Sequence, residues 1–253
     1  MLNLVAMEFK KMKRSIFVWL IPIGAVITAI MEYGSVLYQQ NNNPGTLLNW
    51  DWLVFTNFRY TTMLTSPVLF SLIMGYLIAK EFHEKTINTL FTYSISRVQI
   101  LFAKYLAIIP VIFVFLVVGF LLTLAAGFTV DHPPLEADRF LNYVRAFLWL
   151  TLMTYAFIPI AASVSLIWKS YIASIALGIV ALVCGVVISN SPHLGIIFPW
   201  SAPIIMLSGF VPSGVLYGEG IDYFKGTVSL LAIFAVPFVF NIVYIRRMDI
   251  DND

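Results

Sequence analysis

Long apolar stretches alternate with short polar ones along the whole chain. An α-helix needs about 20 mostly apolar residues to cross a bilayer. Six stretches are long enough, and they cover about residues 16–37, 60–79, 98–130, 140–168, 171–188 and 227–245. The pattern therefore predicts an all-α integral membrane fold with six transmembrane helices.

The residues before the first span have a helical pattern of their own. Apolar residues recur every three or four positions, at Leu2, Val5, Phe9, Met12 and Ile16. The basic residues Lys10, Lys11 and Arg14 fall on other faces. This predicts an amphipathic elbow helix over residues 1–15 that lies in the membrane interface with its basic face toward anionic headgroups. The alternative is a simple extension of the first span.

The stretch between the fifth and sixth spans, residues 189–226, mixes prolines with apolar runs. Its prolines are Pro192, Pro199, Pro203 and Pro212. Non-helical backbone at membrane depth must be shielded by protein or by water. We therefore expect one or two short re-entrant helices on the outer side, broken at the prolines. A plain external loop is the alternative.

Composition supports a membrane environment and a single domain over residues 1–253. The chain is 60% hydrophobic and only 11% charged, whereas a soluble domain has about 25% charged residues. The first apolar run continues past Ile30 without a small-residue cleavage site, so it is expected to be an uncleaved span and not a secretory signal.

The distribution of basic residues predicts the orientation. With six spans, eleven of the 15 lysines and arginines fall on the side that holds both termini. The other four are Arg59, Arg139, Arg145 and Lys225. Loops rich in lysine and arginine stay in the cytoplasm, so both termini are predicted to be cytoplasmic.

The segment between the second and third spans, residues 80–97, is densely charged and patterned: KEFHEKTINTLFTYSISR. Ile87, Leu90 and Phe91 share one helical face. Ser96 and Gln99 form the pattern of a capping box, which starts the next helix. Lys104 is expected to extend to the membrane interface. The pattern predicts a short helix along the cytoplasmic face, and an ordinary positively charged loop is the alternative.

This region resembles the segment that joins spans two and three in ABC-2 type permeases, the membrane subunits of ATP-driven exporters. The residues that carry the resemblance are Glu81, Glu84, Thr86, Leu90, Ser96, Arg97 and Lys104. Lys85 stands where the family commonly has glycine, and Ser94 where it commonly has proline. The order of the spans and the N-terminal elbow extend the resemblance over the whole chain.

The resemblance implies that this segment is a coupling helix, seated in a groove of a separate ATP-binding cassette subunit. The residues implied in that contact are Glu81, Phe82, His83, Glu84, Lys85, Thr86, Asn88 and Thr89, with Arg97 at the end of the turn. ATP and Mg²⁺ would bind to the partner subunit. A second copy or a homologous permease would complete a dimer in the bacterial cytoplasmic membrane. The implied substrates are amphipathic compounds such as antimicrobial peptides, bacteriocins or peptide toxins.

The chain has no sequence signature of an enzyme. It has no G-x-x-x-x-G-K-[ST] loop, and the sequence from His83 to Ile87 lacks the second histidine of H-E-x-x-H. We therefore expect no catalytic, cofactor or metal site in this chain. Two other functions stay open: an ion-coupled secondary carrier and a membrane anchor or sensor that does not transport. The positions of Glu32, Lys104 and Arg145 near the ends of the predicted spans count against a carrier.

Overall fold

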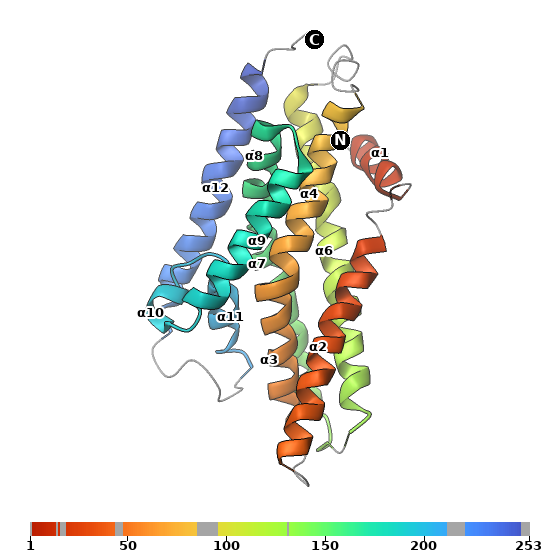
Figure 1. Ribbon diagram of the computed structural model, residues 1–253, viewed down its shortest axis with the longest axis vertical. Helices are drawn as coiled ribbons and strands as arrows, with labels where there is room; N and C mark the ends of the chain where they lie inside the picture. The colour runs from red at the N-terminus through yellow and green to blue at the C-terminus, as the bar shows by residue number, and fades with distance from the viewer. Residues whose placement is uncertain are drawn as a thin grey trace.

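The computed structural model describes residues 2–13, 15, 19–43, 48–84, 96–130, 132–211 and 221–248. These residues form a helical bundle (Figure 1) and include no β-strand. Six helical segments are long and apolar enough to cross a membrane: Leu20–Asn42, Trp50–His83, Arg97–Gly127, Ala137–Trp168, Tyr171–Ile188 and Tyr223–Arg247. The predicted all-α fold with six candidate spans is confirmed.

The first helix, α1 (Leu2–Lys13), precedes the spans, as the sequence pattern predicts. Helix α2 (Leu20–Asn42) is the first span. Helix α1 and the end of the last helix, α12 (Tyr223–Arg247), lie at the same end of the bundle (Figure 1), which we call the terminal end. Helix α1 lies beside α6 at this terminal end.

The second span is longer than the apolar pattern predicts, because it begins at Trp50 and not at residue 60. It is a continuous rod of α3 (Trp50–Tyr60), the π-helical turn η2 (Thr61–Thr65) and α4 (Ser66–His83). Asn49 caps its start by accepting a 2.9 Å hydrogen bond from the Asp51 backbone. Polar residues lower the hydropathy of α3, but its buried face, which includes Leu53 and Phe58, packs into the bundle.

The third span is α6 (Arg97–Gly127), and the predicted capping box at its start is confirmed. The Ser96 side chain accepts from the Gln99 backbone at 3.3 Å, and the Gln99 side chain accepts from the Ser96 backbone at 3.1 Å. The fourth span consists of α7 (Ala137–Tyr155) and α8 (Ile158–Trp168). It was predicted as one run over 140–168, but it breaks just before Pro159, which has no backbone N–H to continue the helix.

The last two spans are α9 (Tyr171–Ile188) and α12 (Tyr223–Arg247). The described residues between them include two short helices, α10 (Pro192–Gly195) and α11 (Ala202–Leu207). Every residue of α11 is buried, and α11 packs against α12, α7 and α3. Two short helices within residues 189–226 agree with the sequence pattern, while their depth in a membrane stays a prediction.

Helix α4 has the most extensive contacts in the bundle and packs against α9 and α8. Small residues lie where the three helices meet: the Ser165 hydroxyl of α8 donates to the Gly75 backbone oxygen of α4 at 3.3 Å and lies 2.7 Å from the Ser174 hydroxyl of α9. By contrast, α2, α9 and α12 have many exposed apolar side chains, among them Ile27, Val180 and Val236. Such surfaces are suited to contact with lipid or with another membrane helix.

Candidate functional site

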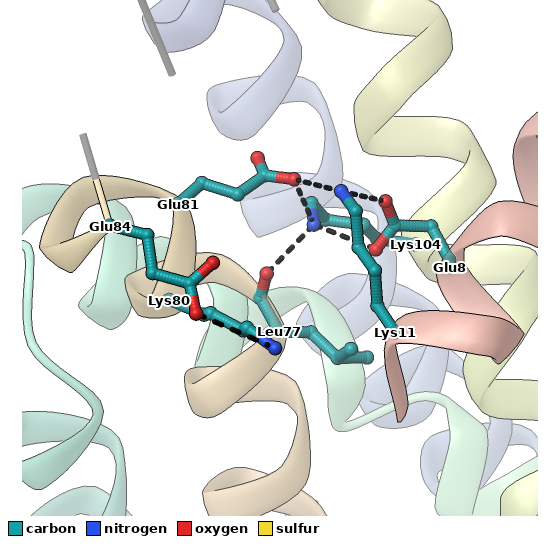
Figure 2. A network of polar contacts seen from close by, with 7 residues as sticks. All are labelled: Glu8, Lys11, Leu77, Lys80, Glu81, Glu84 and Lys104. Atoms are coloured by element: carbon teal, nitrogen blue, oxygen red, sulfur yellow. Dashed lines mark hydrogen bonds and ion pairs between the residues drawn. The ribbon is translucent and has the colours of Figure 1, made fainter. Parts of the chain in front are cut away.

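Four charged side chains meet at the terminal end of the bundle, where α1, α4 and α6 come together (Figure 2). Glu8 and Lys11 come from α1, Glu81 from the last turn of α4, and Lys104 from the second turn of α6. We call these four residues the charge cluster. Glu8 and Lys11 reach the same place because they are three positions apart on one helix.

Lys104 is at the centre of the charge cluster. Its Nζ atom lies 2.9 Å from Glu8 Oε2 and 2.8 Å from Glu81 Oε1, and it donates a hydrogen bond of 2.8 Å to the backbone oxygen of Leu77. Lys11 Nζ lies 3.0 Å from Glu8 Oε1 and 3.3 Å from Glu81 Oε1. Each carboxylate therefore contacts both ammonium groups, and α1 is tied to α4 and α6.

Three of the four groups are buried: Lys104 is 3% exposed, Glu8 4% and Glu81 7%. Burial by itself would raise the pKa of Glu8, but Lys104 and Lys11 outweigh it and hold the pKa below its usual range. Burial would likewise lower the pKa of Lys11, but Glu8 and Glu81 outweigh it and raise the pKa. Glu8 and Lys11 are therefore both charged at neutral pH.

The sequence pattern placed Lys104 wrongly, at the membrane interface. The structure buries it instead, because two carboxylates and a backbone oxygen are available to the ammonium group inside the bundle. Lys11 was expected to face lipid headgroups and instead pairs with Glu8 and Glu81. Glu8 was missed altogether, and the signal that could have found it is its spacing of three from Lys11 in a predicted helix with no other acidic residue.

The residues implied in a partner contact divide between buried and exposed positions. Glu81 is buried in the charge cluster, and Phe82 is half-buried. His83 and Glu84 are exposed, and Glu84 pairs with Lys80 at 3.6 Å. The remaining four, Lys85, Thr86, Asn88 and Thr89, lie outside the described residues, as does the rest of 85–95. The predicted coupling helix therefore stays a prediction.

Arg97, which the resemblance placed at the end of the turn, contacts the other end of the chain. Its guanidinium donates a hydrogen bond to the backbone oxygen of Met248, just after α12. The start of α6 is thereby joined to the end of the last span. Among the described residues, no group of three or more histidine, cysteine or acidic side chains is arranged to hold a metal ion.

The pKa shifts in the charge cluster predict how the docking of α1 depends on pH. Because the pKa of Glu8 is lowered from 4.5, its contribution is complete above that value and is lost as the pH falls through the lower folded-state pKa. Because the pKa of Lys11 is raised from 10.5, its contribution is complete below that value and is lost as the pH rises through the higher one. Spin labels on Lys10 and Leu106, both exposed, should stay at one distance from each other between these two pH limits and move apart in acid. A separation that is unchanged well below pH 4.5 would contradict the prediction.

Six apolar helices with charges confined largely to their ends define a multi-pass integral membrane protein. The chain belongs to the ABC-2 transporter family, since the family's profile, described as ABC-2 family transporter protein, matches residues 4–185. This match begins within α1 and ends within α9, and it includes the whole charge cluster. The chain is therefore a membrane subunit of an ABC transporter.

A curated relative agrees with the family. The chain is 23% identical, over 192 residues, to the bacitracin transport permease protein BCRB of Bacillus licheniformis. The alignment covers 76% of this chain and 88% of the relative. Glu81 and Lys104, two of the residues that carry the sequence resemblance, form an ion pair in the structure.

Proposed function

We propose that this chain is the permease subunit of an ATP-driven exporter in the bacterial cytoplasmic membrane. A separate ATP-binding cassette chain binds ATP and Mg²⁺ and docks on residues 80–97. A second copy of the chain, or a homologous permease, completes the transport path. Both termini are cytoplasmic in this proposal, which is supported by the excess of lysine and arginine on their side.

The charge cluster is the observation that carries this proposal. It holds the end of α4 and the start of α6, which flank residues 85–95, and ties both helices to α1. A partner that pulls on the segment between α4 and α6 therefore moves three helices together, because buried ion pairs resist separation. This is the mechanical property that rigid-body motion of the spans requires.

We also propose that the exported compounds are amphipathic peptides. Support comes from the bacitracin permease relative and from apolar grooves along α12. One groove, of about 340 Å³, lies between α7, α11 and α12 and includes Trp149, Leu152 and Phe234. A second, of about 740 Å³, is lined by α12 residues such as Val228 and Val236 with Ile197. Apolar walls with few polar groups suit an amphipathic ligand that enters from lipid.

The docking proposal predicts that Glu84→Arg removes an ATP-binding cassette chain from the complex. Glu84 is exposed just after α4 and lies within the proposed contact, so reversal of its charge should repel a complementary partner surface. We expect at least a tenfold loss of the co-purified partner in mild detergent, which corresponds to about 1.4 kcal/mol. Mass spectrometry identifies the partner, and ATP hydrolysis by the complex gives a second readout.

Glu136→Arg is the matched control. Glu136 is also exposed, and it pairs with a basic residue, Arg139, at the same 3.6 Å distance, but it lies at the opposite end of the bundle. It should retain the partner. A chain that purifies alone, or one that loses the partner equally in both variants, would contradict the docking site. An ion-coupled carrier purifies without an ATPase, and a non-transporting anchor retains its function when the partner's ATP hydrolysis is blocked.

A further inference from the structure

Glu32 lies in the middle of the first span. It is the thirteenth of the 23 residues of α2, and its side chain is fully buried. The sequence pattern had ended this span near residue 37, which placed Glu32 close to an end. An ionisable group at the middle of a membrane span is costly and is commonly retained for a function.

Two neighbouring helices donate hydrogen bonds to the same oxygen of this carboxyl group. Glu32 Oε2 accepts from Asn57 Nδ2 of α3 at 2.9 Å and from the Thr123 hydroxyl of α6 at 2.8 Å. The other oxygen, Oε1, is buried and has no hydrogen-bond partner among the described residues. This arrangement matches a neutral carboxylic acid. Oε2, which accepts two hydrogen bonds, corresponds to the carbonyl oxygen, and Oε1, which accepts none, corresponds to the hydroxyl oxygen.

No described cation compensates a charge on Glu32. Helix α2 packs against α6, α3, α4 and η2. The charged and titratable residues described on these elements and on α2 itself are Tyr33, Tyr38, Asp51, Arg59, Tyr60, Tyr76, Lys80, Glu81, His83, Arg97, Lys104 and Tyr105. None of them forms an ion pair or a hydrogen bond with Glu32, whose two partners are both neutral.

The cations among these residues are engaged elsewhere. Lys104 is in the charge cluster, Lys80 pairs with Glu84, and Arg97 donates to Met248. Arg59 lies over the ring of Tyr60, 5.5 Å from its centre. An ionised carboxylate with no cation beside it is far less stable in a low-dielectric interior than a neutral acid with one unpaired hydroxyl.

We propose that Glu32 is a proton-binding site inside the membrane, with the proton on Oε1 in this conformation. Release of the proton leaves a carboxylate and transfers H⁺ to water, with no other bond made or broken. A carboxylate needs water or a cation, so it favours a state in which α2 separates from α3 and α6. Movement of α2 is therefore linked to proton binding, and acid favours the packed state seen here.

Infrared spectroscopy of the full chain tests the proposal directly. The chain is placed in vesicles of diether lipids, which have no ester carbonyl groups to mask the signal. At pH 7 exposed carboxyl groups are ionised, so a protonated carboxyl should stand out by its C=O stretching band and by a shift of that band in D₂O. We expect the band in the wild type and in Glu136→Gln, and its loss in Glu32→Gln.

Glu32→Gln keeps an oxygen that can accept from Asn57 and Thr123, so it should fold with an unchanged unfolding midpoint. The wild-type spectrum is informative without any variant, because absence of the band at pH 7 overturns the proposal. A band that persists undiminished in Glu32→Gln also overturns it, since the proton then belongs to another group.

Discussion

Replacement of Lys104 by methionine should destabilise the protein by about 3–5 kcal/mol. Lys104 is 3% exposed and contacts both carboxylates of the charge cluster, at 2.9 Å and 2.8 Å. Without it, the half-buried Lys11 is the remaining cation of the charge cluster, and the two buried carboxylates face each other with less compensation. The measurement is equilibrium unfolding of the full chain in bicelles.

Lys80→Met is the control for this prediction. Lys80 also pairs with a glutamate, Glu84, but the two side chains are 22% and 54% exposed and 3.6 Å apart. Exposed ion pairs contribute about 0–1 kcal/mol, so this variant should unfold almost like the wild type. If the two substitutions cost the same, the charge cluster does not tie the three helices together.

Gly178→Ala should destabilise the contact between α9 and α4 by about 1–3 kcal/mol. A Cβ atom at position 178 would lie 2.5 Å from the backbone oxygen of Pro67 and 2.8 Å from the Cα atom of Val68. Both obstacles are backbone atoms of α4, so no side chain can turn aside to make room. The helices must separate, and the measurement is again equilibrium unfolding in bicelles.

Gly119→Ala tests whether the effect comes from this contact. Gly119 also lies within a membrane span, in α6, but a Cβ atom there has no neighbour within 4 Å. Alanine is favoured over glycine inside a helix by about 0.5–1 kcal/mol, so this variant should be neutral or slightly more stable. Equal losses in both variants would show that the close crossing of α4 and α9 is not the cause.

The spans and the start of α6 could be predicted because they depend on local sequence. A run of about 20 apolar residues indicates a span whatever its neighbours in the bundle are. The capping box is also local, because Ser96 and Gln99 bond to each other at the start of the same helix. The ends of the spans were less predictable. Helix α2 continues through the half-buried Gln39 to the exposed Asn42, and α3 begins at Trp50 and buries polar residues such as Asn57 inside the bundle.

The charge cluster depends on contacts between distant parts of the chain and could not be read from local pattern. Glu8 and Lys104 are 96 positions apart, and only the packing of α1 against α6 shows that they meet. For the same reason, the sequence could not show the hydrogen-bond partners of Glu32, which lie 25 and 91 positions away. The sequence resemblance singled out both Glu81 and Glu84, but the sequence does not show that Glu81 is buried and Glu84 exposed.

The position of Glu32 also bears on the alternative of an ion-coupled carrier. That alternative was disfavoured because no ionisable residue was expected near the middle of a span, and Glu32 occupies such a position. A proton site alone does not define a carrier, since proton-linked movement of α2 is compatible with an ATP-driven exporter. The source of energy therefore has to be tested at the proposed docking segment and not at Glu32.

The most direct test of the account is site-specific photo-cross-linking in native membranes from position 84, with position 136 as the control. The two positions are exposed glutamates at opposite ends of the bundle. The account predicts a cross-link from position 84 to an ATP-binding cassette chain and none from position 136. No such cross-link from position 84, or equal cross-linking from both positions, would contradict it.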